Sequence, residues 1–169
     1  MRKFTSAALA LGAVAVFSAA SALPASAADT TATVTVSSGG LSITAPVSVG
    51  LTAAAPGGTA TGALTGVQVT DLTASTTGWT SSVSATAFAS VGTPAQTMTA
   101  AITYTPTVTA HTGTSTLTPT ASTGSGQVMS ATAVTGNNTA TWDDALSVAI
   151  PSDALAASDY EATITSSVS

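Results

Sequence analysis

The chain of 169 residues has no cysteine, a single histidine (His111) and only two basic side chains, Arg2 and Lys3. A zinc site needs three or four thiolate or imidazole ligands, which this composition cannot supply. The absence of cysteine fits an exported protein that is not a small disulfide scaffold. Aromatic residues make up only 4% of the chain, so an aromatic-lined catalytic cleft is not expected either.

Both basic residues lie at the head of the chain, in MRKFTSAALALGAVAVFSAASALPASAADT. This stretch has the three parts of a secretory signal peptide: a basic start, an apolar run over about 7–20, and an A-x-A site at 25–27. We therefore predict a signal peptide over 1–27 and a single domain over 28–169. The alternative is a transmembrane anchor, which the short apolar run and its small-residue ending disfavour.

Cleavage after Ala27 would remove both basic residues and leave all seven acidic ones: Asp29, Asp71, Asp143, Asp144, Asp153, Asp159 and Glu161. The lack of basic residues argues strongly against nucleic acids as partners and also against anionic lipid surfaces, because both are bound through Lys and Arg. Salt bridges between side chains are excluded for the same reason. No second apolar span follows, so we expect no membrane span after cleavage and only non-covalent retention at a surface.

Alternation of apolar and polar residues is the main structural signal. In LSITAPVSVGL (41–51) the odd positions are apolar and the even ones are mostly Ser, Thr or Gly, and MTAAITY (98–104) and YEATITSSVS (160–169) alternate likewise. Period two is typical of a strand with one face in water. Disorder is the alternative, which a hydrophobic fraction of 44% disfavours. We predict strands near 31–37, 41–51, 63–71, 79–88, 97–105, 107–110, 115–118, 128–135, 140–150 and 160–168.

Gly, Pro and Asn clusters separate these segments and predict turns. They occur at 38–40, 56–58, 92–94, 124–126 and 136–138. Only PSDALAASD (151–159) suits a helical turn, with Ser152 or Asp153 as its cap. Short strands joined by such turns predict an all-β fold, an antiparallel β-sandwich that is immunoglobulin-like or related.

The edges of such a sandwich have little protection against pairing with other chains. Edge strands are usually guarded by charge or proline, and here no lysine remains after cleavage. Pro46 lies inside a strand pattern and indicates an edge or a bulge. Self-association through edge strands is therefore one expected partner mode.

Catalytic constellations are scarce. His111 lies in TVTAHTGTS without a G-x-S-x-G motif, so an exposed loop histidine is favoured over a catalytic base. Asp143 and Asp144 are adjacent and would point to opposite faces of a strand, so a glycosidase would need a further carboxylate such as Asp71 or Asp159. The oxygen-rich run GNNTATWDD (136–144) leaves a calcium site as an alternative.

The stretch around Trp142 presents a conflict. Counting by twos from Trp142 places Leu146 and Val148 on its face, and also Asp144. A buried carboxylate without a cation is costly. We therefore expect the strand to begin near Ala145, or a bulge to reorient it, with both aspartates at a wet strand end. Trp142 is expected to be a core plug in preference to an exposed ligand platform, and Trp79 opens a similar strand.

Three segments together resemble the secreted WxL-type surface domain of Gram-positive bacteria, in its actinobacterial branch. They are GVQVTDLTASTTGWTSSVSATAF (66–88), YTPT (104–107) and NNTATWDDALSVAIPSDALAASDYEATITSSVS (137–169). The strict W-x-L motifs are absent, because Trp79 and Trp142 are followed by Thr80-Ser81 and Asp143-Asp144. The resemblance implies a non-enzymatic β-rich domain outside the cell, which binds the wall non-covalently, with its two tryptophan motifs at Trp79 and Trp142.

The sequence thus predicts a secreted, non-catalytic protein of the cell surface or cell wall. Its expected partners are wall glycan or companion surface proteins, and no cofactor or metal is expected. The candidate binding residues are Trp79, Trp142, Asp143 and Asp144. A carbohydrate-binding or adhesion module and a self-assembling structural subunit are the alternatives; the former needs exposed tryptophans.

Overall fold

The computed structural model describes residues 31–92 and 95–169, and the expected signal peptide lies outside them. Contacts divide the chain into two units, 1–35 and 36–169, and all strands of the described residues belong to the second. The prediction of an all-β antiparallel sandwich is confirmed, while its immunoglobulin-like character stays a prediction. The strands are β1 (Leu41–Thr44), β2 (Thr59–Asp71), β3 (Trp79–Ala85), β4 (Phe88–Ser90), β5 (Thr97–Met98), β6 (Ile102–Pro119), β7 (Ser122–Thr123), β8 (Gly126–Ala149), β9 (Tyr160–Glu161) and β10 (Ile164–Val168).

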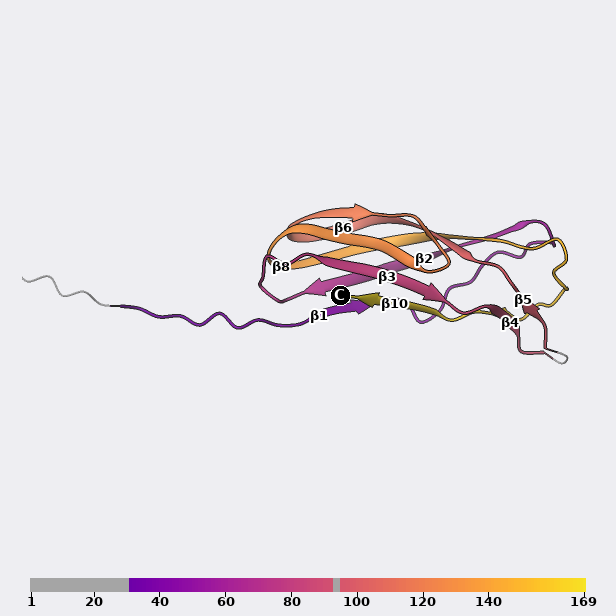
Figure 1. Cartoon of the computed structure of the whole chain (residues 1–169), viewed down its shortest axis with the longest axis horizontal. Helices are drawn as coiled ribbons and strands as arrows, with labels where there is room; N and C mark the ends of the chain where they lie inside the picture. Colours follow the sequence, from indigo (N-terminus) through magenta and orange to yellow (C-terminus); the bar gives the residue numbers. More distant parts are fainter. Residues whose placement is uncertain (1–30, 93–94) are drawn as a thin grey trace, which may run out of the picture. The chain divides into compact units, whose positions relative to one another are not determined.

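Strand β8 organises the larger sheet. One of its edges pairs with β6. Along its other edge, β3 pairs with the first half of β8 and β2 pairs with the second half. The hydrogen-bonded order is β1-β2-β8-β3-β10, and β5-β4-β9 form a small separate sheet. Figure 1 shows β6 and β8 running together along the body while β1, β3 and β10 lie beneath them. The long β6–β8 hairpin therefore joins both layers of the sandwich.

A corner in this hairpin replaces the turn that was predicted at 136–138. Thr112 pairs with Thr139 and Thr114 with Thr135, so Gly113 of β6 stands opposite three residues of β8. Gly113 and Gly136 have φ angles of 84° and 68°, in the left-handed region that glycine adopts without strain. The prediction of separate strands at 107–110, 115–118, 128–135 and 140–150 was wrong, because these glycines bend both strands while pairing continues.

Three other predicted segments differ from the structure. Residues 31–37 alternate like a strand in sequence, yet they form no strand and are exposed. A strand also needs a partner to pair with, and alternation alone does not supply one. The strand predicted over 41–51 ends at Thr44, two residues before Pro46, in keeping with the expected edge position. Over 151–159 there is a turn, with the Ala154 N–H donating to the Pro151 carbonyl, but no helix. Among the described residues, no helix is long and apolar enough to cross a membrane.

The core lies between the inward faces of the two layers. Its largest fully buried side chains are Trp142, Tyr104 and Met129, and Trp79 belongs to the same cluster. The expectation that Trp142 is a core plug is therefore confirmed. Alternation places Ala140, Trp142, Asp144, Leu146 and Val148 inward along β8, which puts one carboxylate among apolar neighbours.

The corner glycines provide a test of this architecture. A Cβ atom at Gly113 would meet the Asn137 carbonyl oxygen and lie 2.9 Å from Asn138 Oδ1, whereas one at Gly136 meets nothing within 4 Å. Gly136→Ala should lower the free energy of unfolding by about 1–2 kcal/mol, the cost of a left-handed L-residue. Gly113→Ala should cost clearly more. Urea unfolding measures both, and equal losses would contradict the close packing at the corner.

Candidate functional site

The predicted wet strand end at Asp143–Asp144 does not exist in the fold, and that expectation was wrong. β8 continues without a break through both residues, and the bulge lies in the neighbouring strand β2, at Thr65–Gly66. Asp144 is 1% exposed and Trp142 is 0% exposed. The Trp142 Nε1–H donates to Asp144 Oδ2 at 3.1 Å. The tryptophan on the same face thus satisfies one oxygen of the buried carboxylate, while no partner for the other, Oδ1, is found in the described part of the chain.

Tyr104, which the sequence analysis did not single out, lies near enough to Asp144 to feel its charge, and its buried hydroxyl has no hydrogen-bond partner among the described residues. Its parity with Ile102 on β6 places it inward, and its ring is fully buried. Burial, and then the charge of Asp144, raise the pKa of Tyr104 to about 12. Burial also raises the pKa of Asp144 above its ordinary value, against the Trp142 hydrogen bond that lowers it, and Asp143 raises it further. This environment favours the neutral forms of both groups.

Asp143 points to the opposite side of the sheet. It is half-buried, and its Oδ1 accepts the N–H of Gly66 at 2.8 Å, which holds the bulge of β2 in place. The opposite orientation of the two aspartates agrees with the strand geometry expected from their adjacency. They therefore do not form one carboxylate pair.

Asp71, one of the further carboxylates named from the sequence, does not complete such a pair at Asp144. Asp71 faces Asn138, six residues along β8 from Asp144, a separation of about 20 Å at the usual rise of a strand. Its Oδ1 accepts the N–H and hydroxyl of Thr73 at 3.0 and 2.7 Å, so it caps a turn. Within residues 31–92 and 95–169, no three His, Cys, Asp or Glu side chains come together as a metal site would require.

The two tryptophans do not form a surface platform. Trp79 is 3% exposed, and no hydrogen-bond partner for its Nε1 is found in the described part of the chain. Of the four candidate binding residues, only Asp143 reaches the surface, and their binding roles stay a prediction. His111 is exposed on β6, with Nε2 2.8 Å from the Ser115 hydroxyl oxygen.

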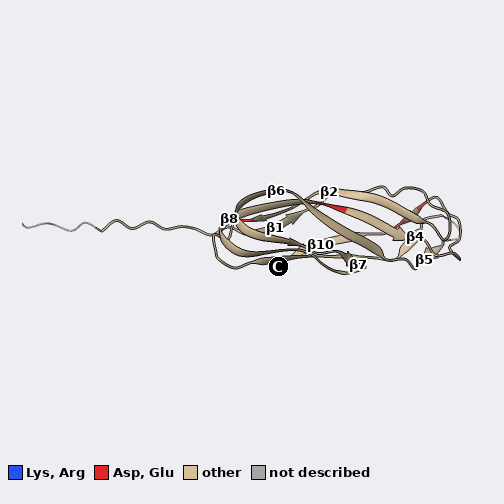
Figure 2. Ribbon diagram, turned by 90° about the horizontal axis from the view of Figure 1, so that it is seen from above, with Lys and Arg blue, Asp and Glu red and all other residues tan. Residues whose placement is uncertain are grey.

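The outward face of β2, β8 and β6 presents almost only small and hydroxylated side chains. Cross-strand rows such as Thr61–Ser147–Thr103, Ala63–Ala145–Thr105 and Thr70–Thr139–Thr112 run across it. We call it the hydroxyl face, composed of Thr59, Thr61, Ala63, Gln68, Thr70, Thr103, Thr105, Thr107, Ala110, Thr112, Thr139, Thr141, Asp143, Ala145, Ser147 and Ala149. Asp143 is its only charged residue, and Figure 2 shows how few acidic segments interrupt the ribbon.

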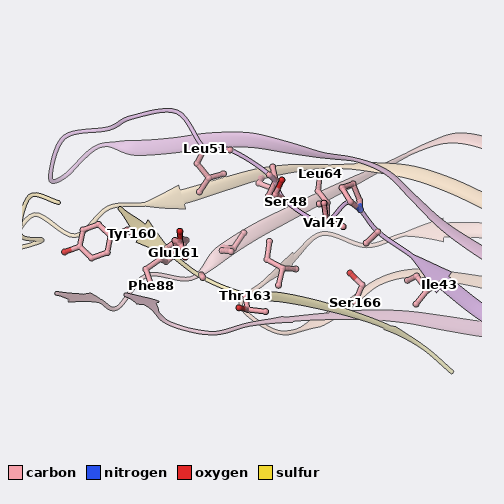
Figure 3. A pocket seen from close by; sticks show the side chains of 18 residues that line it. Ile43, Val47, Ser48, Leu51, Leu64, Phe88, Tyr160, Glu161, Thr163 and Ser166 are labelled. Atoms are coloured by element: carbon pink, nitrogen blue, oxygen red, sulfur yellow. The ribbon is translucent and has the colours of Figure 1, made fainter. Parts of the chain in front are cut away.

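A groove of about 630 Å³ opens between the segment 45–51 and residues 160–166, and we call it the edge groove. Figure 3 shows side chains from these two rims together with those of Leu64 and Phe88, which also line the groove. The lining is mainly apolar, and Glu161 is its one carboxylate. A second hollow of about 780 Å³ shares Leu51, Phe88 and Tyr160 with it.

Comparison of the chain with models of known protein families, with curated proteins and with solved structures finds no match. The likeness to WxL-type domains therefore depends on the sequence motifs quoted above.

The buried Asp144 predicts that stability falls as pH rises. Its folded-state pKa lies above 3.8, so its favourable contribution is complete below pH 3.8 and is lost as pH rises through the folded value. Asp144→Asn should remove this decline and stabilise the protein at pH 7, on the order of 1–3 kcal/mol. Urea unfolding at pH 4 and pH 7 measures it. Asp143→Asn is the matched control, and the same pH effect in both variants would refute the assignment to Asp144.

The Trp142–Asp144 hydrogen bond should contribute measurably to the stability of the fold. Trp142→Phe keeps a ring but removes the N–H, whereas Trp79→Phe removes an N–H for which no protein partner is described. Trp142→Phe should be less stable than Trp79→Phe by on the order of 1–3 kcal/mol. The gap should widen from pH 4 to pH 7, because the ionised carboxylate loses the most. Chemical unfolding of both variants checks this, and a gap independent of pH would argue against it.

Proposed function

We propose that this protein is an exported, non-catalytic domain of the cell surface that associates non-covalently with cell-wall glycan. The signal-peptide pattern over 1–27 and the resemblance to WxL-type domains support the location. The observation that carries the proposed binding mode is the hydroxyl face, a broad sheet surface of Thr, Ser, Ala and Gln with a single carboxylate.

The chemistry of this face suits a neutral polymer. A threonine hydroxyl both donates and accepts hydrogen bonds, as sugar hydroxyls do, and the β-branched side chain is stiff, so little freedom is lost on contact. The exposed threonines Thr105, Thr107 and Thr112 lie along one strand and offer repeated hydroxyls. With both basic residues at positions 2 and 3, anionic polymers meet no cation in residues 31–92 and 95–169.

The alternatives receive less support. A carbohydrate module that stacks sugars on exposed aromatic rings is disfavoured because Trp79 and Trp142 are both buried. A hydrolase using Asp143 and Asp144 is disfavoured because they face opposite sides of the sheet. Self-assembly through edges has structural support of its own and is treated below.

Co-sedimentation with purified Gram-positive cell walls tests the proposal. Wild-type protein should sediment saturably, both with intact walls and with walls stripped of anionic polymers. Thr59→Glu/Thr105→Glu places two charges on the hydroxyl face and should weaken binding about tenfold or more, the loss expected when a few hydrogen bonds are disrupted.

The matched control is Thr132→Glu/Thr165→Glu, which adds the same charge at exposed positions outside the hydroxyl face, on β8 and β10. It should bind like the wild type. Equal weakening in both double variants would remove the hydroxyl face as the contact. Wild-type protein that stays in the supernatant would show that direct wall binding is wrong.

A further inference from the structure

Residues 31–37 have the pattern of a strand without being one. Their sequence TATVTVS alternates Ala32, Val34 and Val36 with threonine and serine, which is the composition of a half-buried strand. Yet they form no strand, and Val34 and Val36 are 89% and 78% exposed. Backbone hydrogen bonds from 31–37 to other described residues are absent, and an exposed row of β-branched apolar side chains of this kind is a template for pairing with another sheet edge.

The edge groove has the complementary features. β10 pairs with β3 along one edge, and in the described part of the chain its other edge is hydrogen-bonded to no strand, although β1 lies beside part of it. Leu64, Ile102 and Leu146 contribute apolar side chains to the lining. The opposite rim, 45–51, belongs to no strand. Neither rim carries a lysine or arginine, the usual guard of an exposed edge.

We propose that residues 31–37 of a second copy of this chain bind along the free edge of β10 as an added strand, with Ala32, Val34 and Val36 directed into the edge groove. The backbone of the inserted segment hydrogen-bonds to the edge, and its alternate side chains fill the apolar lining. Each copy offers one segment and one groove, so head-to-tail addition produces chains of subunits.

Residues 31–37 are less suited to the groove of their own copy, because hydrogen bonds just before β1 restrict the path of the chain. The Gly39 N–H donates to the Leu72 carbonyl at 2.6 Å, and the Leu72 N–H donates to the Gly40 carbonyl at 3.0 Å. These bonds extend the β1–β2 ladder back to Gly39. Only Ser38 then remains between the ladder and residue 37, and a hairpin needs at least two loop residues. Insertion into its own groove would require these bonds to break.

Cysteine trapping tests the insertion, since the chain has no native cysteine. Protein produced from the full coding sequence carries Cys at Val34 or Val36 in one preparation, and at Ala162 or Ser166 of the groove lining in another. Mixing and mild oxidation should yield disulfide-linked pairs of the two chains. Thr33→Cys and Thr35→Cys are the matched controls and should react at least about tenfold less, because alternate strand residues point away from the groove.

Assembly itself is measured by light scattering and size-exclusion chromatography without cell walls, so its outcome is separate from that of wall binding. Wild-type protein should form larger species as concentration rises. Val34→Asp/Val36→Asp should weaken association about tenfold or more, since it places charges in the apolar groove. Thr33→Asp/Thr35→Asp adds the same charge on the outward side and should still assemble. These positions lie outside the strands, so neither double variant should unfold the domain.

Three results would overturn the proposal. One is a monodisperse monomer at high concentration together with no mixed disulfide. The second is trapping that is equal at Thr33 and Val34, which would show contact without strand register. The third is a disulfide that forms within single chains of Val34→Cys/Ser166→Cys independently of dilution, which would show insertion into the same copy.

Discussion

The continuous pairing of β6 with β8 is the constraint on which the rest of the fold depends. Because the ladder passes around the corner at Gly113 and Gly136, one pair of strands contributes to both layers of the sandwich. β2 and β3 then pair with successive parts of the same strand, β8, which places Trp79 and Trp142 in one core. The outward side of this arrangement is the hydroxyl face. A break at the corner would separate these features, because nothing else in the described sheet pairs with both halves of β8.

The near absence of basic residues has consequences in the core and at the surface. Without a cation, the carboxylate of Asp144 has the Trp142 N–H as its one donor among the described residues, and burial favours its neutral form. At the surface, the strand edges lack the lysines that commonly prevent pairing with other chains. The same composition leaves a face that is suited to uncharged polymers. One compositional feature therefore connects a buried titrating group, an unguarded groove and the proposed choice of partner.

Much of the fold could be predicted from local patterns, and the errors have physical causes. Alternation identified β2, β3 and the inward direction of Trp142, because one buried face imposes period two. It failed at 31–37, where the pattern is present but the partner strand is not. Turn chemistry failed at 136–138, because glycine with positive φ serves a bend in a paired strand as well as it serves a reverse turn. The prediction that Asp144 lies at a wet strand end was wrong because it considered the free-energy cost of burying a carboxylate alone. It did not consider the hydrogen bond from the Trp142 indole N–H, which offsets part of that cost.

The sequence by itself determined the class of fold, and it shows the lack of cysteine and of any Lys or Arg beyond position 3. Alternating apolar residues require a two-faced sheet, and a chain whose only basic residues are Arg2 and Lys3 has no Lys or Arg further along to pair with an anionic group. Only the tertiary structure decided which residues meet. The Trp142–Asp144 bond, the burial of both tryptophans, the rows of the hydroxyl face and the edge groove all depend on the register between strands far apart in the chain. That register follows from bulges and a bend, and a periodic pattern does not show where these fall.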